Sequence, residues 1–241
     1  MSQIVPILPA ATVVCTRRDS LGELEVLLLR RNKKLSFASG FWVFPGGKIE
    51  TEDQVNGVVD EQAAQTAAVR EAMEESGLNL INSELFHFKK WTTPLPSNKR
   101  FRTWFFICEL QDGPTNVIID DSEIKDYRWI KAKNALTTIK QDQIKVLPPT
   151  FLTLVRIMHC QNFGDIKTEF SRSPILDIHP RTGLDKGVFH AMYPGDVGYD
   201  DHDIHKIGAR HRIKGNFATG SYEFEYHGCD DVFPVSGGYK W

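Results

Sequence analysis

Apolar residues near the start of the chain form two runs separated by a polar turn. Residues 4–16 are rich in Val, Ile and Ala, and residues 24–30 are dominated by Leu. The segment between them, residues 17–22, contains charged residues and a glycine, which favour a turn. Because short apolar runs bounded by turn residues are typical of buried strands, we predict two buried strands joined as a hairpin.

The rest of the pattern predicts one long helix, a second helix and several strands. Small apolar residues recur at helical spacing over residues 61–76, and Gly77 follows where a C-capping glycine belongs. Thr150 is placed to cap a second helix over residues 151–160, while residues 131–139 fit a helix or a loop. β-Branched and aromatic residues predict strands over six further segments: 85–91, 103–110, 117–119, 127–130, 187–193 and 222–226.

Two consecutive prolines, Pro148 and Pro149, mark the clearest boundary in the sequence. We therefore expect one domain over residues 1–147 and an extension over residues 148–241. The extension is expected to contain a helix and strands packed on the core, and to serve as a cap or as the surface of a homodimer.

Composition and charge narrow the functional classes. The chain has 241 residues, of which 41% are hydrophobic and 25% charged, with a net charge of −2. The absence of a strongly basic balance argues against a nucleic-acid polymer as partner. No apolar run approaches the ~20 residues of a membrane helix, so no membrane partner is expected. The four cysteines are far apart and predict reduced thiols rather than disulfides or a zinc site, and we expect a cytoplasmic protein.

Three carboxylates stand out within the long helix. Glu71, Glu74 and Glu75 occupy positions i, i+3 and i+4, so they share one face of a helix. Like charges at this spacing destabilise a helix by roughly 0.5 kcal/mol per pair. Bound Mg²⁺ or Mn²⁺ would reverse that penalty, since hard divalent cations prefer carboxylate oxygens. The alternative is a solvated acidic face, which the adjacent Arg70 and the glycine-rich loop before the helix make less favourable.

These residues resemble the Nudix box. Arg70–Leu78, read as Arg-Glu-Ala-Met-Glu-Glu-Ser-Gly-Leu, matches the second half of the box at every specified position, and Phe44–Gly47 matches its opening glycine-rich loop. The first half departs from the pattern. Counted from Gly47, its Glu falls on Asp53 and its Arg on residue 61, nine positions before the actual Arg70. The first Glu of the pattern is therefore not assigned to a residue of this chain.

The resemblance implies a fold, a reaction and a set of site residues. The fold would be an α/β/α sandwich with a mixed sheet, followed here by a strand-rich C-terminal extension. The reaction would be hydrolysis of a diphosphate, aided by Mg²⁺ or Mn²⁺. The implied metal ligands are the backbone carbonyl of Gly46 and the side chains of Glu71, Glu74, Glu75 and Glu123. Asp120 and Asp121 are alternatives to Glu123. The implied catalytic residues are Glu71, Glu74, Glu123 and Arg70, with Glu71 or Glu123 as the base.

An upstream pattern bears on the substrate. Nudix enzymes that cleave coenzyme A carry a characteristic spacing before the box, and here Leu27, Leu28, Arg31 and Gly40 fall at its positions. Three specifying residues are replaced, by Leu29, Asn32 and Ser36. The favoured substrate is coenzyme A or an acyl-CoA. The alternatives are a nucleoside diphosphate sugar or dinucleotide, such as ADP-ribose or NADH, and a non-catalytic Nudix module that senses a nucleotide. The candidate substrate-binding residues are Arg31, Gly40, Gly47, Arg100 and Arg102.

The chain from about residue 162 onward holds six of the eight histidines. His202 and His205 lie three positions apart among acidic residues, which is compatible with a second metal site. Surface or hydrogen-bonded histidines are the favoured interpretation, because no spacing in the extension is diagnostic of a metal.

Overall fold

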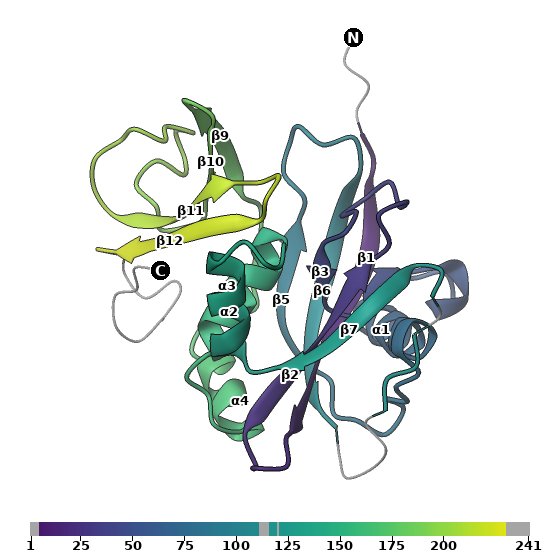
Figure 1. The fold of residues 1–241 in the computed structure, drawn as a ribbon. Coiled ribbons are helices and arrows are strands. Elements are labelled where there is room, and N and C mark those ends of the chain that lie inside the picture. Colours follow the sequence, from purple (N-terminus) through teal and green to yellow (C-terminus); the bar gives the residue numbers. More distant parts are fainter. Residues whose placement is uncertain (1–4, 111–115, 120, 230–241) are drawn as a thin grey trace.

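A large mixed β-sheet forms the centre of the molecule (Figure 1). The computed structural model describes residues 5–110, 116–119 and 121–229. Six strands follow the order β3-β2-β1-β6-β5-β8, while β4 pairs with β1 and β7 pairs with β2. β1 pairs with β6 and β5 with β8 in parallel, and the other pairs are antiparallel. The strands of this sheet are β1 (Ile7–Arg18), β2 (Leu24–Arg31), β3 (Trp42–Val43), β4 (Gly46–Lys48), β5 (Phe86–Thr92), β6 (Arg100–Glu109), β7 (Ile124–Ile130) and β8 (Asp177–Ile178).

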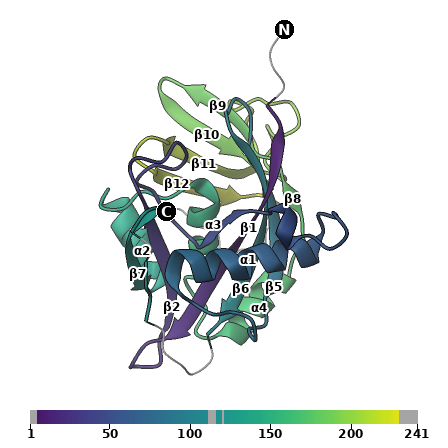
Figure 2. The ribbon, with the colours of Figure 1, turned by 90° about the vertical axis from the view of Figure 1, so that its right-hand side faces the viewer.

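Helices cover both faces of this sheet. Alternate side chains of a strand point to opposite faces, so Val13 and Leu27 pack against the alanines of α1 (Glu61–Ser76). Their neighbours Val14 and Leu28 pack on the other face with residues of three further helices. Figure 2 shows α1 lying across one face, with the other helices behind the sheet. These helices are α2 (Ala132–Lys140), α3 (Pro148–Ile157) and α4 (Phe163–Ser171). The arrangement confirms the predicted α/β/α sandwich.

The α1 helix is fixed at both ends by its own sequence. Asp60 is the N-cap, and its side chain accepts a hydrogen bond of 2.9 Å from the backbone N–H of Ala63. Gly77 adopts a left-handed conformation with φ of 69°, and its N–H donates to the Met73 carbonyl. Five buried alanines let the helix lie close to the sheet, which leaves the glutamates on the side that faces β4: the alanines are Ala63, Ala64, Ala67, Ala68 and Ala72.

The C-terminal extension forms a second, antiparallel sheet in the order β12-β11-β10-β9. Its strands are β9 (Arg181–Asp185), β10 (Val188–Met192), β11 (Arg210–Asn216) and β12 (Ser221–His227). Figure 1 shows this sheet above α3. Ile213, Phe224 and Tyr222 are buried in the same apolar cluster as Phe151 of α3, and the rings of Phe151 and Tyr222 lie 5.7 Å apart. The strand-rich extension is therefore confirmed, while the division at residue 147 and a homodimer remain predictions.

Three local predictions were wrong. Residues 117–119 form no strand. The α3 helix begins at Pro148 rather than after Thr150, because proline is tolerated in a first turn where no N–H partner is lost. Thr150 consequently lies inside the helix, and the helix ends at Ile157 rather than Cys160.

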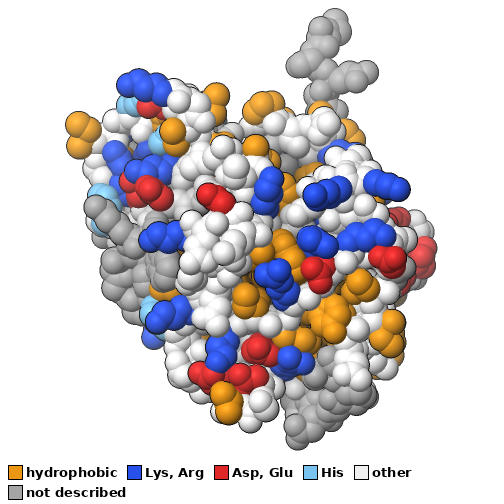
Figure 3. Space-filling view, in the orientation of Figure 1, with side chains coloured by type: hydrophobic (Ala, Val, Ile, Leu, Met, Phe, Trp, Pro, Cys, Tyr) orange, Lys and Arg blue, Asp and Glu red, His pale blue; other side chains and the backbone are white. Residues whose placement is uncertain are grey.

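The surface carries charges of both signs. On the face shown in Figure 3, basic and acidic side chains are interspersed with hydrophobic ones rather than gathered into one basic area. Among the described helices, none combines the length and the apolar character needed to cross a membrane.

Candidate active site

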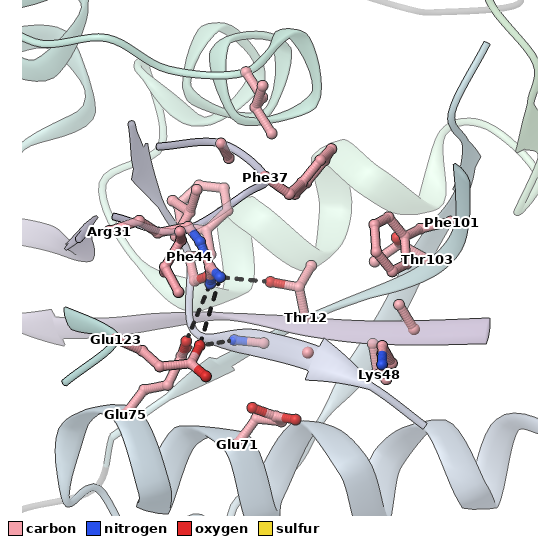
Figure 4. Close-up of a pocket in the computed structure, with 18 of the residues that line it drawn as sticks. Thr12, Arg31, Phe37, Phe44, Lys48, Glu71, Glu75, Phe101, Thr103 and Glu123 are labelled. Atoms are coloured by element: carbon pink, nitrogen blue, oxygen red, sulfur yellow. Dashed lines mark hydrogen bonds and ion pairs between the residues drawn. The ribbon is translucent and has the colours of Figure 1, made fainter. Parts of the chain in front are cut away.

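A cavity of about 660 Å³ opens beside the N-terminal half of β1. One end is formed by the glutamates of α1 and by β4, and the other by the aromatic start of β6 (Figure 4). Its charged lining residues are Arg31, Lys48, Glu50, Arg70, Glu71, Glu74, Glu75, Lys99 and Glu123. The described part of the chain thus brings all four predicted metal-binding glutamates to one cavity.

Arg31 connects the helix to the loop before β7. It is the last residue of β2, at a point where the pairing with β7 shifts register. Its two Nη atoms each lie 3.5 Å from a carboxylate oxygen, one of Glu75 and one of Glu123. The neighbouring Asn32 fixes the loop, since its N–H donates to the Glu123 carbonyl at 2.7 Å. Arg31 therefore holds together two acidic groups that are 48 positions apart in the sequence.

Glu75 is the most buried of these acids, with 5% of its surface exposed. Burial raises its pKa to about 8, although the Gly46 N–H at 3.0 Å and the charge of Arg31 oppose this rise. The negative charges of Glu71 and Glu123 raise the pKa further. Without a bound cation the fold therefore favours the protonated form of Glu75, and a further positive charge in the site would favour its ionised form.

Glu71 explains why the loop before the helix needs glycine. Its carboxylate lies directly over Gly47, where a Cβ atom would come within 2.2 Å of the Oε1 atom. At Gly46 a Cβ atom would lie 2.4 Å from the Ala11 carbonyl oxygen. Burial raises the pKa of Glu71, and the ion pair with Arg70 opposes that rise. The two glycines therefore bring backbone into contact with both the central strand and the acidic helix.

Arg70 organises the exposed side of the carboxylates. Its Nη1 atom lies 3.0 Å from Glu71 and 3.1 Å from Glu74. Its Nε and Nη2 atoms donate to the two oxygens of Asp53 at 3.0 and 2.8 Å. Asp53 is buried and also accepts from the Glu50 N–H at 2.8 Å. This fork fixes the guanidinium of Arg70 beside the two glutamates.

Asp53 is a residue that sequence counting left unassigned. It ends a 3-10 helix, η1 (Thr51–Asp53), and the additional residues of the box follow it. The spacing from Gly47 to Asp53 is therefore that of the pattern, and only the segment up to Arg70 is longer. If the insertion is placed after residue 53, Asp53 occupies the position of the first Glu of the pattern. That placement would have predicted an interaction between Asp53 and Arg70.

The donor chemistry of the cavity fits a hard divalent cation. Glu71, Glu74, Glu75 and Glu123 all line it, and each offers only carboxylate oxygens, as Mg²⁺ and Mn²⁺ prefer. Within the described residues, no three such side chains already converge on one point, in this cavity or among the histidines of the extension. Arg31 forms an ion pair with Glu75, and Arg70 forms one with Glu71, so these two arginines supply positive charge beside the carboxylates. The Gly46 carbonyl as a metal ligand stays a prediction.

The predicted substrate-binding residues divide into two groups. Arg31 and Gly47 line the cavity, whereas Gly40, Arg100 and Arg102 do not. Gly40 occupies a turn with φ of 73°. Arg100 donates through Nε to the Thr93 carbonyl at 3.0 Å.

Arg102 forms an ion pair of 2.6 Å with Asp177. Lys99, next to the predicted basic residues, lines the cavity instead, as does Lys48. Of the alternatives to Glu123, Asp121 forms an ion pair with Lys125 away from the cavity lining, and Asp120 lies outside the described residues.

Comparisons with known proteins agree with this geometry. The family model for the NUDIX domain matches residues 7–149. The chain is 25% identical over 217 residues to putative nudix hydrolase 7 of Caenorhabditis elegans, covering 73% of this chain and 70% of the relative. It is 24% identical over 291 residues to the acyl-coenzyme A diphosphatase NUDT19 of Xenopus laevis, covering 78% of this chain and 75% of the relative.

A solved structure shares the fold. The NUDIX hydrolase of Alicyclobacillus acidocaldarius superposes with a TM-score of 0.59 at 24% identity, covering 68% of this chain and 97% of that one. The family model spans more than half of the chain, including the glycine-rich loop, the acidic helix and the strands that carry them. The chain therefore belongs to the Nudix family and is a Nudix hydrolase.

Proposed function

We propose that this hydrolase cleaves the diphosphate of coenzyme A or an acyl-CoA with the help of Mg²⁺ or Mn²⁺. The observation that carries the proposal is the two-sided character of the cavity. A cluster of four carboxylates lies at one end, and the same cavity continues along an apolar wall. A coenzyme A thioester has a matching part for each region. Its charged diphosphate suits a cation held by the carboxylates, and its long, weakly polar pantetheine and acyl arm suits the apolar wall.

The apolar wall is continuous with the core of the protein. It is formed by side chains from the loop after β2, the connection between β3 and β4, the strands β5 and β6, and the N-cap and first turn of α3: Leu35, Phe44, Trp91, Phe105, Leu147 and Pro149. Burying apolar surface contributes about 25 cal/mol per Å², so a pantetheine or acyl arm lying on this wall adds to affinity. A short, hydroxyl-rich sugar gains less from the same wall.

Two further observations support a coenzyme A substrate. Leu27, Leu28, Arg31 and Gly40 keep the spacing of the pattern found in coenzyme A-cleaving members of the family. A relative matched over most of both chains is named as an acyl-coenzyme A diphosphatase. Arg31 is also the residue of that pattern that reaches the carboxylates.

The residues present account for the chemistry as follows. Glu71, Glu74, Glu75 and Glu123, with the Gly46 carbonyl, would hold the divalent cation. When bound, such a cation supplies charge neutralisation at the phosphates and a lowered pKa for the attacking water. The water oxygen forms a bond to one phosphorus, and the bond from that phosphorus to the bridging oxygen breaks. The leaving phosphate keeps the electron pair of that bond.

The protein's own side chains handle the proton and the positions. Glu71 or Glu123 accepts the proton of the water, since both carboxylates line the cavity. Arg70 keeps Glu71 and Glu74 in place through its fork on Asp53. Arg31 presents its guanidinium beside Glu75 and Glu123, where it can pair with the phosphates.

A substrate panel tests the proposal. The full chain is incubated with Mg²⁺ and coenzyme A, a long-chain acyl-CoA, ADP-ribose or NADH, and the products are separated by chromatography. We expect the highest kcat/KM for coenzyme A or the acyl-CoA, with 4′-phosphopantetheine or its acyl form as one product. A higher kcat/KM for ADP-ribose or NADH would overturn the proposal. It would favour the second candidate, a nucleoside diphosphate sugar or dinucleotide diphosphatase, which the replacements at Leu29, Asn32 and Ser36 also suggest.

A further inference from the structure

The loop after β2 meets the start of β6 at the end of the cavity away from the carboxylates. The loop after β2 carries Ser36 and Phe37, Lys99 lies in the turn before β6, and Phe101 lies at the start of β6. The Lys99 ammonium donates a hydrogen bond of 2.6 Å to the Ser36 hydroxyl. The rings of Phe37 and Phe101 lie 5.2 Å apart at 61°, in an edge-to-face contact. All four residues line the cavity, so the contact between these two segments is also part of its wall.

The ring faces at this end are available to a ligand. Phe37 and Phe101 are each half-buried, and an edge-to-face contact does not cover both faces of both rings. Figure 4 shows Phe101 and Thr103 at the opposite end of the view from Glu75 and Glu123, with Phe37 above the cavity. Aromatic faces of this kind stack on nucleobases.

The charges of the cavity are unevenly compensated. Of its four cations, Arg31 and Arg70 form ion pairs with glutamates. Within the residues that the structure describes, Lys48 and Lys99 form no ion pair with a carboxylate. The hydrogen-bond partner of Lys99 is a neutral hydroxyl, and its side chain is exposed to the cavity. An ammonium whose hydrogen-bond partner is neutral can pair with a phosphate without giving up an ion pair.

Ser36 gives this position a particular meaning. It stands where the upstream pattern of coenzyme A-cleaving members has its second arginine, and that cation is absent from this chain. Lys99 is 63 positions further along the sequence, and its ammonium lies against Ser36. A cation is thus present at this place, but it comes from a different segment.

We propose that Lys99, Phe37 and Phe101 form a subsite for a nucleoside that carries a further phosphate monoester on its ribose, with Lys99 binding that monoester. The proposal rests on the proposed function, because the diphosphate is taken to lie at the carboxylate end. The nucleobase stacks on the phenylalanine rings, and the monoester replaces Ser36 as the partner of the Lys99 ammonium. Lys99 is then a specificity-determining residue that separates coenzyme A from diphosphates without the third phosphate.

A binding experiment tests the subsite without turnover. The affinities of adenosine 3′,5′-bisphosphate and 5′-AMP for the full chain are measured by calorimetry in buffer without divalent cations. We expect the bisphosphate to bind the native chain about tenfold or more tightly than 5′-AMP, and Lys99→Met to remove that preference. Lys99→Arg should retain it. The absence of a preference in the native chain, or an equal effect of Lys99→Met on both ligands, would overturn the proposal.

Turnover of coenzyme A and 3′-dephospho-coenzyme A gives a second, separate readout. Lys99→Met should lower kcat/KM for coenzyme A about tenfold or more, chiefly through KM, and leave 3′-dephospho-coenzyme A nearly unchanged. Lys140→Met, an exposed lysine of α2 outside the cavity lining, is the matched control and should change neither value.

The two proposals fail in different ways. If the native chain cleaves neither coenzyme A nor its dephospho form, the proposed function is wrong, and the binding experiment still decides the subsite. If the native chain cleaves both and Lys99→Met slows them equally, the subsite is wrong and the proposed function stands.

Discussion

Replacing Glu75 with glutamine should stabilise the protein in the absence of divalent cations. Glu75 is 5% exposed, and its burial raises its pKa to about 8. A neutral amide of the same size removes the cost of burying a charge there. The glutamine oxygen can still accept the hydrogen bond from the Gly46 N–H, which is 3.0 Å from the carboxylate.

The magnitude follows from the pKa. The unfolded chain loses this proton near the usual value of 4.5, while the folded protein keeps it up to about 8. The folded state therefore binds more protons in this window, so stability falls as pH rises from about 4.5 to about 8. This difference between the folded and unfolded pKa values corresponds to a loss of at most about 5 kcal/mol of unfolding free energy above pH 8. We expect a loss of about 2 kcal/mol or more. Glu75→Gln avoids this loss.

Urea denaturation in EDTA at pH 5 and pH 8 measures the effect. The free energy of unfolding of Glu75→Gln should exceed that of the native chain by about 2 kcal/mol or more at pH 8, and by much less at pH 5. Saturating Mg²⁺ should then stabilise the native chain, by about 2.7 kcal/mol at 100 times the Kd, and the variant less. Glu84→Gln is the control, because Glu84 is an exposed acid that pairs only with the half-buried Lys167 in the described contacts.

Two results would contradict these roles of Glu75. A variant that is less stable than the native chain at pH 8 in EDTA would show that the Glu75 charge is not costly in the fold. Equal stabilisation of both proteins by Mg²⁺ would show that Glu75 takes no part in binding the cation.

Two other substitutions probe the groups around Glu71. Gly47→Ala places a Cβ atom 2.2 Å from Glu71 Oε1, so the carboxylate must move. We expect kcat to fall by about 100-fold with a small change in Tm. An unchanged kcat in steady-state assays would contradict the close approach. Asp53→Asn weakens the fork on Arg70 and should cost about 1–3 kcal/mol of unfolding free energy at pH 7, measured by urea denaturation. Burial raises the pKa of Asp53, but hydrogen bonds from Arg70 and the Glu50 N–H lower it overall. The contribution of Asp53 to the unfolding free energy should therefore disappear as pH falls through that lowered pKa. A difference in unfolding free energy between the native chain and Asp53→Asn that persists at low pH would count against the ion pair.

Local sequence signals predicted the parts of the site that are close together in the chain. Glu71, Glu74 and Glu75 share a helix face by spacing alone, and the C-cap of α1 was readable from Gly77, whereas its N-cap, Asp60, was not predicted. Glu123 was chosen for its position before the Trp129 strand, and the structure places it in the cavity. The three glutamates of α1 were thus predicted from local spacing, whereas Glu123 was chosen from the family resemblance.

Signals that depend on tertiary structure were not readable. Arg100 and Arg102 were chosen for their charge, but the alternate residues Phe101 and Thr103 line the cavity. Side chains of a strand alternate between two faces, and the sequence does not tell which face meets the cavity. Lys99 gains its role only because the loop containing Ser36 folds against it.

The C-terminal sheet shows the same limit in its strands. β10 and β12 carry apolar and aromatic alternation and were predicted, whereas β11 contains four basic residues in seven and was not. One of them, Arg212, is buried in a bidentate ion pair with Asp196, at 2.6 and 2.7 Å. A buried charge pair hides a core position from any prediction based on hydrophobicity.

The proposed function gives the carboxylates of α1 the task of supporting metal-dependent cleavage of a coenzyme A diphosphate. Glu74 tests it most directly, because its side chain is 57% exposed and its loss should leave the fold intact. The measurement is the initial rate of release of adenosine 3′,5′-bisphosphate from coenzyme A with Mg²⁺, for the native chain and for Glu74→Gln. An equal Tm for the two proteins serves as the control that the variant is folded. We predict equimolar bisphosphate and 4′-phosphopantetheine from the native chain and a rate lower by about 100-fold or more in the variant. Undiminished release by Glu74→Gln would contradict the account.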